Sequence, residues 1–189
     1  MASNNTEIEI KIPITKEDFF RLKEQLKNNF IKNTKQKDTY YTPSHRNFIA
    51  EKYPFEWVRI REQGVKAILN YKHYYPERAE KNTHCDEYET IIDQEQIKKI
   101  LNALNFKELI TVNKIRETYN YKDFEIALDE VDELGFFVEI EAINNLETVE
   151  QTREELYKIA RELNINTTNE DIRGYPYLML DKKGLMPRA

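Results

Sequence analysis

Polar and apolar residues alternate with a period of two along seven segments of the chain, a pattern that predicts β-strands. In the first, Ile8 and Ile10 would lie on one face of the strand and charged residues on the other. The segments are residues 6–14, 55–62, 66–74, 84–92, 112–121, 124–131 and 136–143. The extended segment 35–42 raises the number to about eight. Single glycines within 61–67 and 132–136 mark tight turns, as antiparallel hairpins require.

Three other segments carry apolar residues at helical spacing, and each begins with a capping signature. The caps are Thr15 with Asp18, Asp93 with Gln96, and Thr148 with Gln151; the apolar faces run to Phe30, Leu104 and Leu163. Strands and helices do not alternate regularly, so the pattern predicts an α+β protein built on an antiparallel sheet. No linker or repeat divides the sequence, and we expect one domain over residues 1–189.

Charge and cysteine content narrow the class of protein. Charged residues make up 33% of the 189 residues, the formal net charge is -5, and aromatic residues make up 12%. The net charge argues against a general nucleic-acid binder, and the aromatic content against a disordered chain. Cys85 is the single cysteine, so no disulfide framework is expected. With no signal peptide or apolar segment long enough to cross a membrane, we expect a soluble cytoplasmic protein.

Like charges recur in pairs on the polar faces of five predicted strands. The pairs are Glu7/Glu9 with Lys11, Arg59/Arg61, Glu87/Glu89, Lys114/Arg116 and Glu139/Glu141. A solvated strand face explains any single pair, but on an outer surface the two like charges within each pair repel slightly and gain nothing, so five such pairs ask for another cause. Inside a closed barrel, acidic strands would hold cations and basic strands the accompanying anions, which indicates a metal-bound polyphosphate. Carboxylates without histidine or cysteine favour magnesium or manganese.

The order of these motifs resembles the CYTH superfamily, the triphosphate tunnel metalloenzymes, which includes class IV adenylyl cyclases and thiamine triphosphatases. Residues 7–11 match its Glu-x-Glu-x-Lys signature, and residues 36–48 its Asp-Thr-Tyr-Tyr segment with the Pro-x-x-Arg-x-Phe stretch of the cyclase branch. Further similar segments are 57–62, 67–72 with Asn70 where threonine is usual, 86–89, 114–119, 127–141, and 173–184 with Gly174 in place of serine. The resemblance covers nearly the whole chain.

The resemblance implies a fold and a set of site residues. The fold would be an eight-stranded antiparallel β-barrel, the triphosphate tunnel, with helices outside, and the charged face of residues 7–11 would look into the tunnel while Ile8 and Ile10 pack under a helix. The implied metal ligands are Glu7, Glu9, Glu139 and Glu141, with Asp129 as a further one. The implied catalytic and triphosphate-binding residues are Lys11, Arg59, Arg61, Lys72, Lys114 and Arg116. Other implied substrate-binding residues are Asp38, Tyr40 and Glu89. Glu89 is chosen because it matches an acidic tunnel position better than Glu87 does.

Three functions are compatible with this machinery. Residues 42–48 and 175–180 favour a class IV adenylyl cyclase, which converts ATP to cyclic AMP and pyrophosphate. The alternative is a triphosphatase that hydrolyses thiamine triphosphate, tripolyphosphate or a nucleoside triphosphate. A non-catalytic module that binds polyphosphate or nucleotides is the third. We therefore expect Mg²⁺ or Mn²⁺ as cofactor and a small-molecule triphosphate as partner, without nucleic acid or membrane; a homodimer is compatible with the sequence.

Overall fold

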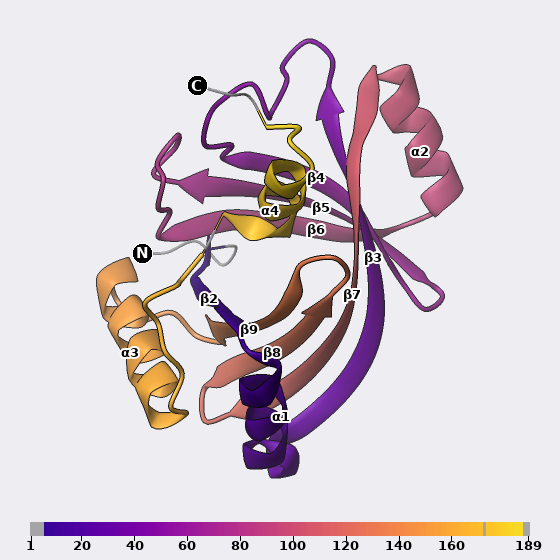
Figure 1. Cartoon of the computed structure of the whole chain (residues 1–189). Helices are drawn as coiled ribbons and strands as arrows, with labels where there is room; N and C mark the ends of the chain where they lie inside the picture. The colour runs from indigo at the N-terminus through magenta and orange to yellow at the C-terminus, as the bar shows by residue number, and fades with distance from the viewer. Residues whose placement is uncertain (1–5, 172, 187–189) are drawn as a thin grey trace. The chain divides into compact units, whose positions relative to one another are not determined.

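The computed structural model describes residues 6–171 and 173–186 (Figure 1). The described chain contains nine β-strands and four α-helices, and the strand pairs with a defined register are antiparallel. The predicted α+β class and antiparallel sheet are therefore confirmed. The strands are β1 (Thr6–Glu7), β2 (Glu9–Ile14), β3 (Phe30–Pro43), β4 (Glu56–Gln63), β5 (Lys66–Tyr75), β6 (His84–Ile92), β7 (Phe106–Tyr121), β8 (Phe124–Val131) and β9 (Gly135–Ala142). The count exceeds eight because Ile8 separates β1 from β2.

The described residues form two compact units. Unit 1 consists of the chain up to Thr34 together with Lys114–Ile172. Unit 2 consists of Lys35–Asn113 together with the chain from Arg173 onward. The two long strands β3 and β7 each contribute one part to either unit. The sequence analysis did not distinguish these units, because no linker or change in composition marks the points at which the chain passes from one to the other.

Unit 1 has its strands in the order β7, β8, β9, β2, and its core lies on one face of this sheet. Ile10 on β2 lies directly opposite Ile140 on β9, and both are fully buried. The same core cluster contains Ile8, Leu22 of α1 (Lys16–Gln25) and Leu156 of α3 (Val149–Glu162). The prediction that Ile8 and Ile10 pack under a helix is confirmed, with α1 and α3 beside β2 and β9 (Figure 1).

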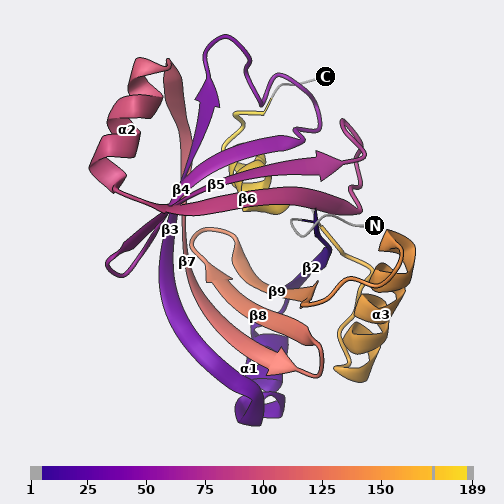
Figure 2. The ribbon, with the colours of Figure 1, turned by 180° about the vertical axis from the view of Figure 1, so that it is seen from behind.

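Unit 2 has its strands in the order β3, β4, β5, β6 and carries the smaller core. Leu101 of α2 (Gln94–Ala103) packs with Ile60 of β4 and Tyr41 of β3 on one face of these strands. Seen from behind, α2 connects β6 to β7 (Figure 2). The other helix of unit 2 is α4 (Gly174–Lys182), most of whose residues are buried.

The three predicted helix starts are confirmed by their caps. The hydroxyl of Thr15 accepts a hydrogen bond from the Asp18 amide at 3.0 Å, and Asp93 caps α2 in the same way. At α3 a full capping box forms. The Thr148 hydroxyl accepts a hydrogen bond from the Gln151 backbone amide, and the Gln151 side-chain oxygen accepts one from the Thr148 backbone amide. Among the residues that the structure describes, no helix is both long and apolar enough to cross a membrane.

Two details of the helices differ from the prediction. The first helix ends at Gln25, and a short 3-10 helix, η1 (Lys27–Asn29), follows it. Phe30, which was expected on the helical apolar face, instead begins β3 and is 48% exposed. Helix α4 was not predicted, for two reasons. Its N-cap residue, Arg173, makes no side-chain capping hydrogen bond. Most of its residues are buried, so its sequence lacks the periodic pattern of polar and apolar residues that marks a surface helix.

Candidate functional site

The face of the unit 1 sheet opposite the core carries most of the predicted charged residues. Residues directly opposite on neighbouring antiparallel strands share a face, so the register assigns them. Lys11 pairs with Glu139, Glu9 with Glu141, and Arg116 with Asp129. We call this the unit 1 charged face; its members are Glu9, Lys11, Lys114, Arg116, Asp129, Glu139 and Glu141. The structure thus brings together the basic pair of β7 and the acidic residues of β2, β8 and β9.

Asp129 is the most heavily bonded carboxylate of the unit 1 charged face, and its side chain is 0% exposed. The Arg116 guanidinium donates to both of its oxygens, from Nε to Oδ1 at 2.7 Å and from Nη2 to Oδ2 at 2.6 Å. The Lys114 ammonium donates to Oδ2 at 2.9 Å. Burial opposes ionisation, but Arg116 and Lys114 outweigh it and lower the pKa of Asp129. Asp129 therefore serves as the counter-ion of both basic residues.

Glu139 is the second buried carboxylate of this face. Its Oε1 accepts from the Lys11 ammonium at 2.9 Å, and its Oε2 is paired with Arg116. Lys11 also donates to Glu9 at 3.3 Å. Burial works against the charge of Glu139, yet Arg116 and Lys11 hold its pKa well below the usual value. Glu139 of β9 is therefore ionised, and Lys11 links it to Glu9 of β2.

The donor set of the unit 1 charged face suits a hard divalent cation. Its acidic side chains offer carboxylate oxygens without histidine or thiolate, the ligands that magnesium and manganese prefer. Glu7 in β1 and Glu141 in β9 are half-buried. Glu125 was not predicted: it lies directly opposite Glu141 and extends the row begun by Glu9. Within residues 6–171 and 173–186, no three acidic, histidine or cysteine side chains are gathered as a formed metal site.

Unit 2 presents a second set of charged residues on one face of its strands. The register places Asp38 opposite Arg61, Tyr40 opposite Arg59, and Lys72 opposite Glu87. We call this the unit 2 charged face; its members are Asp38, Tyr40, Trp57, Arg59, Arg61, Asn70, Lys72, Glu87 and Glu89. The structure thus gathers the remaining predicted residues of the chain on the face opposite Ile60 and α2.

Asp38 holds both arginines of β4. Arg61 binds it through a fork, with Nε to Oδ1 and Nη2 to Oδ2 both at 2.7 Å. Arg59 donates from Nη1 to Oδ2 at 3.3 Å. The Asp38 side chain is 1% exposed, whereas each arginine is 13% exposed. Tyr40 is buried beside them; burial raises the pKa of its phenol, and Arg59 opposes that rise.

The acidic residue that joins this cluster on β6 is Glu87. Its Oε1 accepts a hydrogen bond from the buried Asn70 amide and lies 3.6 Å from the Lys72 ammonium and 3.8 Å from Arg59. Glu89, the residue preferred in the sequence analysis, shares the face but is exposed. Strand parity could not choose between them, because both lie on the same face, and the preference for Glu89 rested on the resemblance alone. Asn70 was noted only as a departure from the family motif.

Two buried donors of β4 have no hydrogen-bond partner among the described residues. They are Nε of Arg59 and the indole Nε1 of Trp57. The two side chains are two residues apart on one strand and therefore point to the same face. Trp57 is 4% exposed and packs edge-on against Tyr40, with ring centroids 5.9 Å apart. Buried donors without partners are rare, and an acceptor-rich ligand such as a phosphate would satisfy them.

The loop after β3, which carries the Pro-x-x-Arg-x-Phe stretch, is tied to unit 2 by specific bonds. The Thr42 hydroxyl accepts from the Phe48 amide at 2.8 Å, which closes the loop on itself. Arg46 reaches Glu56 of β4 with a 2.9 Å ion pair and lies over the Phe48 ring. Phe48 itself is buried. The arginine of this motif therefore has a structural contact inside unit 2.

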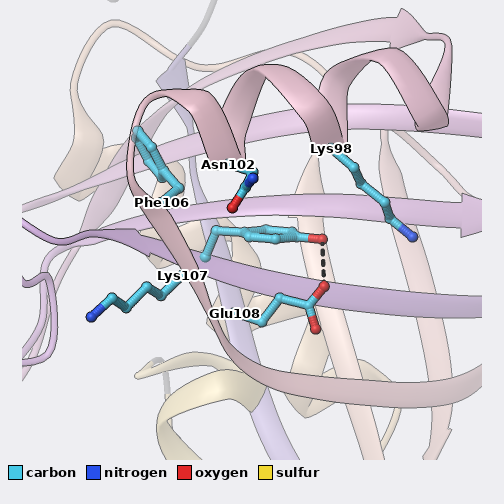
Figure 3. Close-up of a pocket in the computed structure, with 6 residues that line it drawn as sticks. Lys98, Asn102, Phe106, Lys107 and Glu108 are labelled. Atoms are coloured by element: carbon cyan, nitrogen blue, oxygen red, sulfur yellow. Dashed lines mark hydrogen bonds between the residues drawn. The ribbon is translucent and has the colours of Figure 1, made fainter.

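A separate pocket of about 320 Å³ lies beside α2 (Figure 3). Its lining residues are Tyr41, Lys98, Asn102, Phe106, Lys107 and Glu108. The dashed line in Figure 3 marks the bond from the Tyr41 hydroxyl to Glu108, which is 3.2 Å long. Figure 3 shows Asn102 pointing from α2 into this pocket, whereas Lys107 extends away from it. None of the predicted site residues lines this pocket. Tyr41, which does, lies on the opposite face of β3 from the predicted residue Tyr40.

Comparisons with known proteins agree with the predicted resemblance. The family model described as the CYTH domain matches residues 5–175. A protein of Methanocaldococcus jannaschii named "Putative adenylate cyclase" is 33% identical over 183 residues, which are 95% of this chain and 99% of that protein.

Among solved structures, PH1819 from Pyrococcus horikoshii is 31% identical, with a TM-score of 0.78 over 93% of this chain and 99% of that one. A "putative adenylyl cyclase" from Hippeastrum, described as having a dominant triphosphatase activity, shares the fold: it is 16% identical with a TM-score of 0.66, over 96% of this chain and 97% of that one.

Proposed function

Because the chain belongs to the CYTH domain family, we propose that it is a metal-dependent enzyme that acts on a triphosphate and is of the class IV adenylyl cyclase type. The family acts on triphosphates and requires a divalent metal. The choice of cyclase is supported by the name of the Methanocaldococcus jannaschii relative, which is similar over nearly its whole length. It is further supported by the cyclase-like segments 42–48 and 175–180 of this sequence.

The observation that carries the anionic substrate is the charge balance among the buried and half-buried residues of the unit 2 charged face, which do not include the exposed Glu89. The basic residues Arg59, Arg61 and Lys72 exceed the two carboxylates with which they are paired, Asp38 and Glu87. The donors without partners, on Arg59 and on the neighbouring tryptophan, add hydrogen-bonding capacity for an oxygen-rich ligand. A triphosphate carries about four negative charges near neutral pH, and arginine forks are the side chains best suited to phosphate oxygens.

The unit 1 charged face would hold the metal. Glu9, Glu139 and Glu141 of this face, together with Glu7 of β1, are the residues that we assign to the metal, because they offer oxygen ligands of the kind that magnesium and manganese take. Such an ion, when bound, neutralises charge on phosphate oxygens and makes phosphorus easier to attack. Lys11 bridges Glu9 and Glu139, and we assign its ammonium to a phosphate oxygen that accompanies the metal.

In the proposed reaction the ribose 3'-hydroxyl oxygen of ATP forms a bond to the α-phosphorus. The bond from this phosphorus to the oxygen shared with the β-phosphate breaks, and pyrophosphate leaves while the hydroxyl proton passes to solvent. The basic side chains bind and orient the triphosphate and stabilise the charge on the leaving pyrophosphate. No residue of the chain needs to form a covalent bond with the substrate.

A triphosphatase is the second candidate, since the same fold has a dominant triphosphatase activity in the Hippeastrum protein. In this reaction the oxygen of water would form a bond to the terminal phosphorus of thiamine triphosphate, tripolyphosphate or a nucleoside triphosphate. The bond from this phosphorus to the bridging oxygen would break, the diphosphate product would leave, and the attacked phosphoryl group would become orthophosphate. The two candidates use the same charged groups and differ in which phosphorus is attacked.

A product analysis tests the proposal. The full chain is incubated separately with ATP, thiamine triphosphate and inorganic tripolyphosphate, each with Mg²⁺ and with Mn²⁺, and the products are separated by chromatography. We expect cyclic AMP and pyrophosphate from ATP. The Glu141→Gln variant, purified in the same way, controls for contaminating enzymes. If orthophosphate and no cyclic AMP were formed under every condition, the chain would be a triphosphatase and not a cyclase. Tight binding of all three without turnover would favour a non-catalytic binding module.

A further inference from the structure

Two buried aspartates, one in each unit, are built into the sheet in the same way. Asp38 and Asp129 each lie directly opposite an arginine of the neighbouring strand, Arg61 and Arg116 respectively. In both cases Nε and Nη2 of that arginine donate to the two carboxylate oxygens, at 2.6–2.7 Å. In both cases the basic residue two positions earlier on the same strand donates to Oδ2.

The bonds of Asp129 leave little reason for a metal to bind there. Magnesium binds carboxylate oxygen at about 2.0–2.1 Å. The nitrogens of Lys114 and Arg116 already lie 2.9 and 2.6 Å from Oδ2, and Arg116 is 2.7 Å from Oδ1. A cation on either oxygen would therefore be adjacent to two positive groups, which repel it. Glu139 also has a basic partner on each oxygen, but each oxygen accepts only one and the side chain is 8% exposed, whereas Oδ2 of Asp129 accepts two and its side chain is 0% exposed. Asp38 has the same surroundings in a unit where no metal ligand is predicted, so the arrangement does not depend on a metal.

The fork has a clear effect on the arginine. A guanidinium has five N–H donors, and the fork uses the edge formed by Nε and Nη2, so that its plane is fixed relative to the sheet. An arginine side chain otherwise loses rotamer entropy when it is immobilised. An arginine that is already ordered by a buried carboxylate can bind an anion without this cost, which is the general benefit of preorganisation.

From this geometry we infer that Asp38 and Asp129 are positioning residues: each orients a pair of basic side chains for the triphosphate, and Asp129 is not a metal ligand. The inference rests on the proposed function for the identity of the anion. It changes the role that the resemblance implies for Asp129, and it assigns the same role to Asp38 in the other unit.

A metal titration tests the role of Asp129 directly. The affinity of the full chain for Mn²⁺ is measured without any triphosphate, from the electron paramagnetic resonance signal of free Mn²⁺, for the wild type and for Asp129→Asn, Asp38→Asn and Glu141→Gln. We expect both asparagine variants to stay within about twofold of the wild type, while Glu141→Gln weakens binding by tenfold or more. A loss in Asp129→Asn equal to that in Glu141→Gln would show that Asp129 is a metal ligand.

Tripolyphosphate binding in the presence of EDTA tests positioning separately from metal. Removing a negative charge should by itself strengthen the binding of an anion. Loss of positioning should weaken it, and we expect both asparagine variants to bind about tenfold more weakly by calorimetry. Asp38→Glu and Asp129→Glu keep the charge but move the carboxylate by one methylene, so they should bind more weakly as well. Tighter binding in the asparagine variants with unchanged binding in the glutamate variants would overturn the inference.

A measurement on the wild type without substrate keeps the inference testable even if the variants fold poorly or the chain does not bind tripolyphosphate. In the wild type, the Nε–H groups of Arg61 and Arg116 should give nuclear magnetic resonance signals that are protected from exchange with water, because both donate to buried oxygens. Their rapid exchange in the wild type would contradict positioning. If the wild type neither bound nor converted a triphosphate, the proposed function would fail, while the Mn²⁺ titration and these signals would still decide the role of the aspartates.

Discussion

The charged faces of the two units contain the same arrangement of an aspartate and a basic pair. They differ in the residues that the strand following this arrangement in the sequence contributes. Each has a buried aspartate that holds a basic pair from the neighbouring strand. In unit 1 the following strand adds Glu139, and Lys11 links it to Glu9. In unit 2 the following strand adds Asn70 and Lys72.

This difference sets the kind of ion that each face suits. The unit 1 charged face has four carboxylates and three basic groups, whereas the unit 2 charged face has three of each. In unit 2, Glu89 is exposed, so three basic groups are paired with the two less exposed carboxylates, Asp38 and Glu87. The same local arrangement, an aspartate with two basic partners, is thus combined with additional carboxylates in unit 1 and with Asn70 and Lys72 in unit 2. If the proposed function holds, the neighbouring strand, and not the basic pair itself, sets the preference of each face for metal or phosphate.

The largest effect should follow from removing a carboxylate of unit 1. Glu141→Gln should lower turnover of the preferred triphosphate by at least about 100-fold, because the neutral amide binds a divalent ion far more weakly. Steady-state rates with Mn²⁺ measure this, and EDTA should abolish the wild-type activity as well. Glu130→Gln, an exposed residue of the same unit, is the matched control and should keep full activity. Activity that persists in EDTA would show that the reaction does not need a metal held by the unit 1 carboxylates.

A smaller effect, on anion binding, is expected from the arginine fork of unit 2. Arg61→Lys keeps the charge but cannot form the two-bond fork with Asp38, so tripolyphosphate affinity in EDTA should fall by about tenfold. Isothermal calorimetry measures it, and Mn²⁺ affinity should not change. The matched control is Arg78→Lys, an exposed arginine of the same unit. If both lysine variants bind tripolyphosphate as the wild type does, the unit 2 charged face is not the anion site.

The smallest effect should have the opposite sign and should appear in unit 1. Lys11 competes with a metal for Glu9 and Glu139, so Lys11→Gln should bind Mn²⁺ about threefold more tightly without triphosphate. The same variant should bind tripolyphosphate more weakly, since one cationic ligand is lost. Lys16→Gln, an exposed change of equal charge, should alter neither affinity. Weaker Mn²⁺ binding in Lys11→Gln would mean that the lysine supports the carboxylates instead of competing for them.

The local structure that the sequence predicted correctly depends on short-range rules. The three capped helices and the alternating strands follow from hydrogen bonds and periodicities within a few residues, as the caps at Thr15 and Thr148 show. Helix α4 and the strand conformation of Phe30 were not predicted. Helix α4 is mostly buried and has no capping side chain, and such a helix depends on its surroundings more than on its own pattern.

The sequence by itself determined which residues are charged, which strand face they occupy and which family the chain resembles. Strand parity is a property of the backbone, so Glu9 and Glu139 could be assigned to the face opposite Ile10 without coordinates. Only the tertiary structure decided which charges meet. It placed Glu87 beside Arg59 and Lys72, left Glu89 exposed, and surrounded Asp129 with Lys114 and Arg116. Partners across strands depend on register and on side-chain direction, which bring together residues that are far apart along the chain.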